Sequence, residues 1–428
     1  MRVHIISVLM FVVVNSGGLS AQDTQTQAGS NFPIHFQGFV LGDYSARAGE
    51  EHPASDQGGR FLWADERLRL EASGKTAQGR LSFQFKGDLF YDNVSNKPNG
   101  VVREAYLDAS RSAFDVRIGR QIVTWGVGDL VFINDVFPKD WQAFFSGRSL
   151  EYMKLGVDAA KFQLATPVLN AEFLVIPFFQ RDNLPPADRF FFFDPFASIT
   201  TRVLRKPAST PGNTEFALRL YRRIADADVS LYAYRGYWRQ PSFLPDELPV
   251  PTQLNGFFPR LATFGASTQR NIGAGLLSLE AGYYDSLDDR SGSNPAVPNS
   301  ELRFLAGYQR QLATEFTVGA QYYTEIMKDY SAYKATLPPG FPLQDRLRHM
   351  LALRLTKFVK YQTWRLSLFS FYSPSDQDAM LIPELWHAFS DRLSLTVGTN
   401  LFAGRRRTTA LGQYDRNSNL YLVLRYDF

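Results

Sequence analysis

The sequence contains no cysteine among its 428 residues. Without thiols, the chain can form neither a disulfide framework nor a thiolate metal or redox site. It also lacks the G-x-S-x-G turn of many hydrolases, the H-E-x-x-H pair of zinc proteases and a phosphate-binding glycine loop. We therefore expect no bound cofactor and no covalent chemistry.

Long runs of a single residue class are missing too. The longest basic block is Arg405 to Arg407, and the formal net charge is only +4, which argues against nucleic acid as a partner. No uninterrupted apolar stretch approaches the roughly 20 residues that a membrane-spanning helix needs. If the chain crosses a membrane, strands must therefore carry it across.

The N-terminal residues predict export. A basic start, MRVH, precedes the apolar run IISVLMFVVV, and the small-residue sequence GLSA follows. This order is typical of a secretory signal peptide, which we assign to residues 1–21. The alternative is a hydrophobic first strand of the core. Residues 22–428 show no linker, charge run or composition shift, so we expect them to form a single domain.

The rest of the chain alternates between apolar and polar residues. In LSFQFKGDLFY, Leu81, Phe83 and Phe85 fall on one face of an extended segment, and Gln84 and Lys86 fall on the other. The stretches TEFALRLYRR and DRLSLTVGTNLF repeat the pattern. An apolar face opposite a polar face, repeated along the chain, is typical of a transmembrane β-barrel with lipid outside and water inside.

Short links such as SGKTAQ, RNIGAG and LATE join the segments at one end, and most links at the other end are long. Bacterial up-and-down antiparallel barrels have short periplasmic turns and long extracellular loops of this kind. We therefore predict an all-β transmembrane barrel of about 18 strands with both chain ends in the periplasm. Sixteen strands is the alternative, because residues 101–124 and 377–389 alternate poorly. The expected segments are 33–47, 60–73, 79–91, 101–110, 113–124, 150–165, 170–180, 214–224, 228–238, 259–271, 275–286, 300–311, 314–327, 343–358, 361–373, 377–389, 391–403 and 418–428.

The last segment, NLYLVLRYDF, ends on an aromatic residue. Leu420, Leu422, Leu424, Tyr426 and Phe428 share one of its faces. Such a strand resembles the signal that the outer-membrane assembly machinery reads on its substrates, and we assign this signal to Tyr426 and Phe428. We therefore expect the cell outer membrane as the location, with its lipids and assembly machinery as partners. The alternative is the terminal strand of a soluble sandwich.

Residues 118–141, IGRQIVTWGVGDLVFINDVFPKDW, resemble a run of residues found in a known family, WG-x-x-D followed by a further aspartate and then P-[RK]-D. The matching residues are Trp125, Gly126, Asp129, Asp135, Pro138, Lys139 and Asp140. The chain is similar through them to a family of predicted Gram-negative outer-membrane proteins of unknown function, which is itself distantly similar to alginate-export and porin-type barrels. The resemblance implies a barrel in the outer membrane and implies no substrate.

The polar faces of the expected strands carry more basic than acidic residues. A guanidinium keeps its charge and can bind a carboxylate or phosphate through two hydrogen bonds, so a basic lumenal wall would favour anions. The alternative is that arginines interleave with acids to hold a rigid, water-filled wall. The arginines that we expect to line the lumen are Arg67, Arg69, Arg219, Arg303, Arg346, Arg348, Arg354 and Arg365.

The connection after the fifth segment, residues 125–149, is far longer than a link between neighbouring strands requires. Water-filled barrels often narrow their lumen with an inward-folded loop. We predict that this connection folds into the barrel, with its aspartates facing lumenal arginines and its tryptophans packed at its two ends. The alternative is that the aspartates only brace the loop. The candidate constriction residues are Trp125, Asp129, Asp135, Asp140 and Trp141.

Another loop contains four consecutive phenylalanines, Phe190 to Phe193, and Phe196. Exposed aromatic residues at this density normally contact another group. We expect them to pack into the barrel mouth as a lid; the alternative is that they bind an apolar ligand at the surface.

These features predict a channel and no enzyme. His349 lies on an expected outward face, where a lipase histidine would lie, but no nucleophile accompanies it, and we interpret it as part of an aromatic belt. The predicted function is the passage of a small or linear, anionic solute, by export of an oligosaccharide or by uptake of organic acids. The alternative is a closed barrel that binds at the cell surface or partners another envelope protein.

Overall fold

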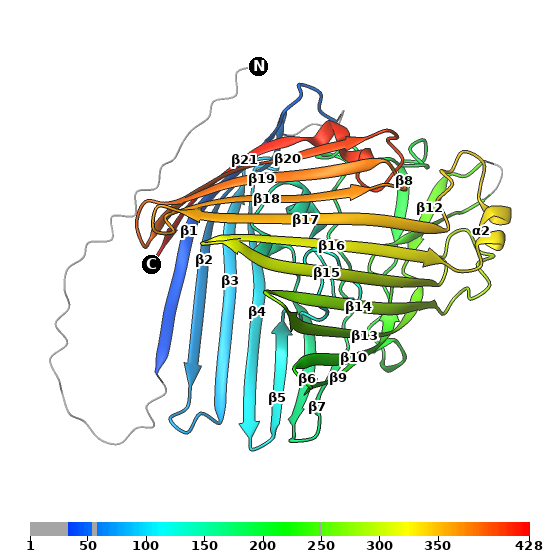
Figure 1. The fold of residues 1–428 in the computed structure, drawn as a ribbon. Helices are drawn as coiled ribbons and strands as arrows, with labels where there is room; N and C mark the ends of the chain where they lie inside the picture. Colours follow the sequence, from blue (N-terminus) through cyan, green and yellow to red (C-terminus); the bar gives the residue numbers. More distant parts are fainter. Residues whose placement is uncertain (1–32, 54–57, 248–249) are drawn as a thin grey trace. The chain divides into compact units, whose positions relative to one another are not determined.

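The computed structural model describes residues 33–53, 58–247 and 250–428, and the predicted signal peptide lies outside them. Eighteen strands form a closed antiparallel barrel, because β1 pairs with both β2 and the last strand, β21 (Figure 1). The predicted fold is confirmed, with eighteen strands rather than sixteen. The strands are β1 (Ile34–Arg47), β2 (Phe61–Lys75), β3 (Leu81–Asp92), β4 (Lys97–Arg111), β5 (Phe114–Gln121), β6 (Val157–Ala165), β7 (Asn170–Ile176), β9 (Glu215–Ile224), β10 (Ala227–Tyr237), β13 (Arg260–Ile272), β14 (Gly275–Ser286), β15 (Glu301–Ala313), β16 (Phe316–Met327), β17 (Leu347–Val359), β18 (Trp364–Ser373), β19 (Asp378–Ala388), β20 (Leu393–Gly404) and β21 (Asn419–Asp427).

Each expected segment overlaps one of these strands. Two of the differences in their bounds have a local cause in the wall. The sixth strand begins at Val157 rather than at residue 150, because Leu150–Tyr152 form a 3-10 turn. In β4, the pairing with β3 shifts beside Lys86, and Arg103 and Glu104 both contact lumenal groups. A β-bulge places two neighbouring residues on one face in this way, which explains the poor alternation of residues 101–110.

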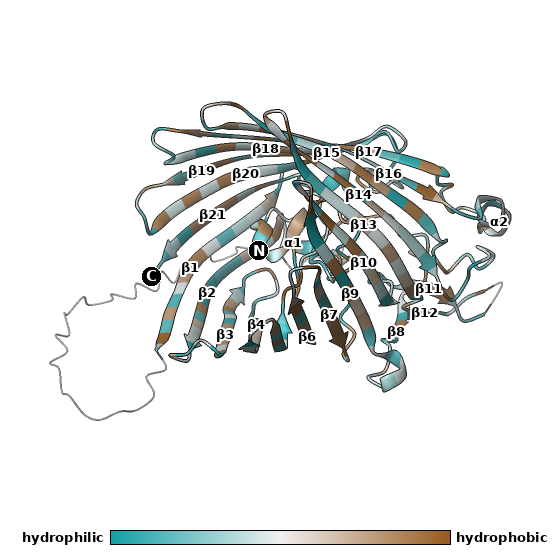
Figure 2. Ribbon diagram, turned by 60° about the horizontal axis from the view of Figure 1, so that its bottom comes forward, coloured by the Kyte–Doolittle hydropathy of each residue, from teal (hydrophilic) through white to brown (hydrophobic). Residues whose placement is uncertain are grey.

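The two faces of the wall differ in the way that lipid and water require. In β21, Leu420, Leu422 and Leu424 point outward and are 59, 42 and 46% exposed, whereas Tyr421 and Val423 are buried on the inside. Figure 2 shows hydrophobic and hydrophilic positions alternating along the strands. A closed barrel leaves no strand edge unpaired, so an apolar exterior of this kind suits a bilayer. The protein is therefore an outer-membrane β-barrel.

The connections are short at one end of the barrel and mostly long at the other. In the short turn between β9 and β10, Ala225 and Asp226 both have positive φ angles, 44° and 68°, as a tight hairpin turn requires. The longer connections at the opposite end are residues 48–60, 122–156, 177–214, 238–259, 287–300, 328–346 and 405–418.

Five of these connections, 122–156, 177–214, 238–259, 328–346 and 405–418, carry helices, 3-10 turns or strands of their own. β8 (Thr201–Leu204), β11 (Ser242–Pro245) and β12 (Gln253–Phe257) form a separate small sheet, and α2 (Tyr330–Thr336) lies between β16 and β17. Within the part of the chain that the structure describes, no helix is both long and apolar enough to span a membrane.

Candidate pore constriction

The connection between β5 and β6, residues 122–156, lies against the inner face of the wall, and we refer to it as the crossing segment. Its helix α1 (Trp141–Phe145) lies within the ring of strands in Figure 2. The segment bonds to Arg69 of β2 through Tyr152 and to Glu280 of β14 through Val127. These two strands lie about half the circumference apart in the eighteen-stranded ring, so the segment crosses the lumen.

The first turn of the crossing segment wraps around a carboxylate of the wall. Glu280 is 4% exposed and accepts the backbone N–H groups of Val127 (2.8 Å), Gly128 (3.1 Å) and Asn134 (2.8 Å). Gly126 has φ +79°, and a Cβ added there would lie 2.5 Å from Glu280 Oε1. The close approach therefore requires glycine at this position.

Trp125 and Asp129 fix the beginning of the crossing segment. Trp125 is buried, and its Nε1 donates to Glu172 of β7 at 2.7 Å. Its ring packs edge-on against Phe137, with ring centroids 5.0 Å apart. The Asp129 carboxylate accepts two hydrogen bonds, at 2.8 and 2.9 Å, from Nη1 of Arg354 in β17. Asp129 is thus the one of the three predicted aspartates that pairs with a lumenal arginine.

Asp135 and Asp140 have partners other than the expected arginines. Asp135 pairs with Lys139 (2.8 Å) and Lys154 (2.7 Å), which belong to the same segment. Asp140 caps α1 by accepting the backbone N–H of Ala143 at 2.8 Å. Burial raises the pKa of Asp140 and lowers the pKa of Lys139. Short acidic side chains bond readily to nearby groups of their own chain, so these two aspartates brace the segment.

Aromatic packing holds the middle of the crossing segment. A one-turn helix is not stable alone in water, but Phe144 and Phe145 of α1 are buried, and each such burial contributes about 1.5–3 kcal/mol. Trp141 lies between Phe132 and Phe145, with ring centroids 6.3 and 6.0 Å away, and so in the middle of the segment rather than at its end. We call the following residues the aromatic cluster, into which Met380 also packs: Phe132, Trp141, Phe144, Phe145, Phe369, Phe371, Phe402 and Tyr414.

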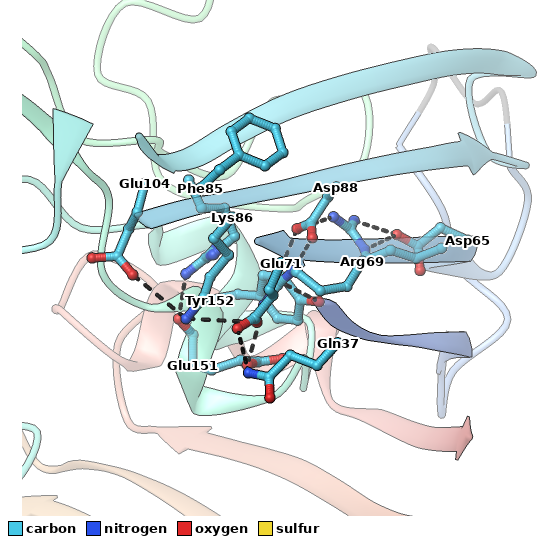
Figure 3. Close-up of polar contacts among 12 residues, drawn as sticks. Gln37, Asp65, Arg69, Glu71, Phe85, Lys86, Asp88, Glu104, Glu151 and Tyr152 are labelled. Carbon is cyan, nitrogen blue, oxygen red and sulfur yellow. Dashed lines mark hydrogen bonds and ion pairs between the residues drawn. The ribbon is translucent and has the colours of Figure 1, made fainter. Parts of the chain in front are cut away.

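Cations surround the end of the crossing segment. The buried ring of Tyr152 has four guanidinium groups between 4.2 and 5.5 Å from its centroid, those of Arg67, Arg69, Arg103 and Arg148. Acids compensate them: Asp88 bonds to Arg67 and Arg69. Figure 3 shows the adjoining part of this network, where Lys86 lies between Glu71 and Glu104.

Seven of the eight arginines predicted for the wall lie on inward-facing strand positions, and most of them have acidic partners. Arg219 instead donates to Ser230 Oγ at 3.2 Å. Arg346 is exposed and precedes β17, because the strand begins at Leu347 rather than at residue 343. The ion pairs are Arg67 with Asp65 and Asp88, Arg69 with Asp88, Arg303 with Glu301, Arg348 with Glu325 and Asp376, Arg354 with Asp129, and Arg365 with Glu384.

Sequence reasoning missed several of these acids. Asp65 lies two residues before Arg67, and Glu301 lies two residues before Arg303. Residues two apart in a strand share a face, so the same alternation that identified the arginines could have identified these partners. The partner of Arg365, Glu384, lies on the neighbouring strand and has no such local signal.

A cavity of about 500 Å³ remains between the crossing segment and the wall formed by β17 to β21. Arg354 also borders a second cavity, of about 80 Å³, together with Asp129 and Gln321. Among the residues that line the larger cavity are Arg148, Glu151, Leu130 and Leu150 of the segment and Arg354, Arg365, Ile382, Glu384, Trp386, Arg425 and Asp427 of the wall.

The phenylalanine-rich connection packs onto the long-loop end of the barrel. Phe190 is buried, and the backbone of Phe191 exchanges hydrogen bonds of 2.9 and 2.6 Å with Asn417, between β20 and β21. The Arg416 guanidinium lies 3.8 Å from the centroid of the Phe191 ring. Because this connection leaves from β7, it crosses from one side of the ring to the other. Phe190 and Phe191 thus form part of a lid.

The predicted assembly-signal residues lie at the seam where the barrel closes. Tyr426 and Phe428 are exposed, and the Phe428 backbone exchanges two hydrogen bonds of 3.0 Å with Gly38 of β1.

Comparisons with known proteins agree with this fold. A family model described as a protein of unknown function (DUF1302) matches residues 31–418, whereas no curated protein matches the chain. OccK2 (OpdF) of Pseudomonas aeruginosa, solved in complex with glucuronate, aligns at 11% identity and a TM-score of 0.57, over 92% of this chain and 98% of its own. OccK11 (OpdR) of the same organism aligns at 11% identity and a TM-score of 0.54, over 92% and 96%.

Proposed function

The chain belongs to the DUF1302 family of proteins of unknown function, and we propose that it is an outer-membrane channel for a small or linear anionic solute. The observation that carries this proposal is the cavity of about 500 Å³ beside the crossing segment. A solute that traverses the barrel has to pass between this segment and the wall. It would meet Arg354, Arg365 and Arg425 there, and guanidinium groups attract anions and bind carboxylates well.

The similar barrel OccK2 was solved with glucuronate, which is a carboxylate. At 11% identity this likeness supports no correspondence between single residues. The argument for an anion therefore rests on the arginines of this chain.

We expect the preference for anions to be modest, because acids neutralise much of the basic wall. In the cavity, Glu384 bonds to Arg365 at 2.7 Å and Asp427 to Arg425 at 2.6 Å. Paired charges partly cancel each other's field at a distance, so the preference is weaker than the number of arginines alone would give.

Ion selectivity in planar bilayers tests the proposal. We expect discrete openings and, under a KCl gradient, a reversal potential with the sign of anion selectivity. The double variant R354Q/R365Q should shift this potential toward the cation value, because it removes two positive charges from the cavity lining. The control is R117Q, since Arg117 pairs with Asp108 at 2.7 Å on β4 and β5, outside the cavity. A cation-selective wild-type channel would contradict the anion proposal.

The second candidate is a closed barrel that binds at the cell surface or partners another envelope protein. The observation that favours it is the combination of the lid at Phe190 and Phe191 with a segment that crosses the lumen. If the folded barrel inserts into bilayers and remains silent, this second candidate is the better account.

A further inference from the structure

We propose that Arg354 is the binding site for the carboxylate of an amphipathic solute, and that Asp129 occupies this site when no solute is bound. The inference rests on the proposed channel function and deepens it by naming the class of solute. That class is a small organic acid with one carboxylate and an apolar or aromatic body.

The contact between Arg354 and Asp129 is exposed enough to exchange. Their side chains are 45% and 33% exposed, and their atoms approach to 2.8 Å. The pair of Arg148 with Asp43, by contrast, is 5% and 1% exposed. Water-exposed ion pairs hold their partners weakly, whereas separating a buried pair leaves an uncompensated charge. A solute carboxylate can therefore displace Asp129 from Arg354.

Arg354 keeps donors available for a second acceptor. Both bonds to Asp129 come from Nη1, and within the described residues no hydrogen bond uses its Nε or Nη2. A guanidinium carries five N–H donors in a planar fork, which suits a carboxylate held through two bonds. Asp129 therefore engages only one of the terminal nitrogens of Arg354. A solute carboxylate can accept hydrogen bonds from two of its nitrogens and so bind it more tightly than Asp129 does.

Apolar side chains lie around this charge. Leu130 and Leu150 of the crossing segment and Ile382 and Trp386 of β19 line the same cavity as Arg354. Leu130 directly follows Asp129 and has φ +61°, a conformation that a bulky residue rarely adopts. When Asp129 leaves Arg354, this residue is free to relax against the body of the solute. Such a lining binds a solute with an apolar body more tightly than a small hydrophilic anion, because only the apolar body can pack against it.

The acids of the cavity restrict the charge of the solute. Glu151, Glu384 and Asp427 line the same space. A second negative charge on the solute would lie close to these carboxylates and be repelled by them. The site therefore favours monoanions over dianions.

Equilibrium binding to the purified full-length barrel tests the site. The probes are benzoate, acetate, benzyl alcohol and phthalate, which differ in apolar body or in charge. We expect benzoate to bind at least tenfold more tightly than acetate, benzyl alcohol or phthalate. D129N should tighten benzoate binding about five- to tenfold because the internal competitor is lost, R354Q should abolish binding, and R354K should weaken it.

D108N serves as the matched control. Asp108 also pairs with a lumenal arginine, Arg117, and does not line the cavity, so D108N should bind benzoate as the wild type does. The heat-modifiable folded form is checked for every variant. Unchanged or weaker benzoate binding by D129N, or wild-type binding by R354Q, overturns the proposal.

The binding measurement separates this inference from the channel function. If the barrel never conducts but D129N tightens benzoate binding, the channel function is wrong and the proposed binding site stands. If the barrel conducts but neither D129N nor R354Q changes benzoate binding, the channel function stands and the proposed binding site is wrong.

Discussion

Glu280 illustrates how a single wall residue positions the crossing segment. It is nearly inaccessible, and its carboxylate receives backbone N–H groups from Val127, Gly128 and Asn134. A hydrogen bond to a charged acceptor contributes about 1.5–3 kcal/mol, so several such bonds on one carboxylate hold the first turn of the segment firmly. Arg354 holds the same turn through Asp129, but that contact is partly exposed to water.

We therefore expect E280Q to loosen the first turn while the barrel remains folded. Glutamine keeps one acceptor oxygen and loses the charge, which costs about 1–3 kcal/mol locally. Hydrogen exchange at the amides of Val127, Gly128 and Asn134 should then be roughly 10- to 100-fold faster. S278A is the control, since Ser278 lies two residues away on the same inward face. Equal protection in E280Q and wild type would show that the carboxylate is not the anchor.

At the scale of elements, the crossing segment lies across the lumen, and we propose that it sets the free width of the channel. We expect that replacing residues 127–146 by a short Gly-Ser link raises the single-channel conductance several-fold. The replaced residues include α1 and the contacts to Glu280 and Arg354. The strands keep their backbone pairing, so the barrel should still fold.

A change in a loop that does not cross the lumen controls for this replacement. A Gly-Ser link in place of residues 289–296, between β14 and β15, should leave the conductance near the wild-type value. If the shortened crossing segment also conducts like the wild type, the constriction lies elsewhere in the barrel.

The strands were predictable from the sequence because their pattern is local: apolar and polar residues alternate within each strand, and lipid and water impose that alternation. The contacts of the crossing segment were not predictable in this way. Glu280 contacts Val127 across about 150 residues of chain, and no residue spacing in the sequence predicts that contact. Asp135 was expected to pair with a lumenal arginine, and this was wrong. It pairs instead with Lys139, which lies only four residues away and so is closer along the chain than any arginine of the wall.

At the scale of the whole molecule, the barrel depends on one seam that joins its first and last strands. β1 and β21 pair from Phe39 with Asp427 to Arg47 with Asn419, and Phe428 extends the pairing through its two bonds to Gly38. Inside this closed wall, the aromatic cluster holds the crossing segment against β18, β19 and β20, near the end of the chain. The guanidinium groups of Arg67 and Arg69, which lie near the Tyr152 ring, hold it against β2, near the beginning of the chain. The wall must close before these contacts can form together, because they join residues from both ends of the chain.

We expect the seam to fail when Phe428 is removed. The deletion loses two backbone hydrogen bonds together with an aromatic side chain that is 53% exposed on the outside. F428A keeps the backbone bonds and loses only the ring, so it separates closure from recognition by the assembly machinery. Outer membranes from cells that express each variant should contain less heat-modifiable folded barrel for the deletion than for the wild type. If F428A is depleted as strongly as the deletion, the ring is the signal; if F428A accumulates normally, the seam bonds are what assembly requires. Normal amounts of the deletion variant, at both low and high expression, would contradict any role of Phe428 in assembly.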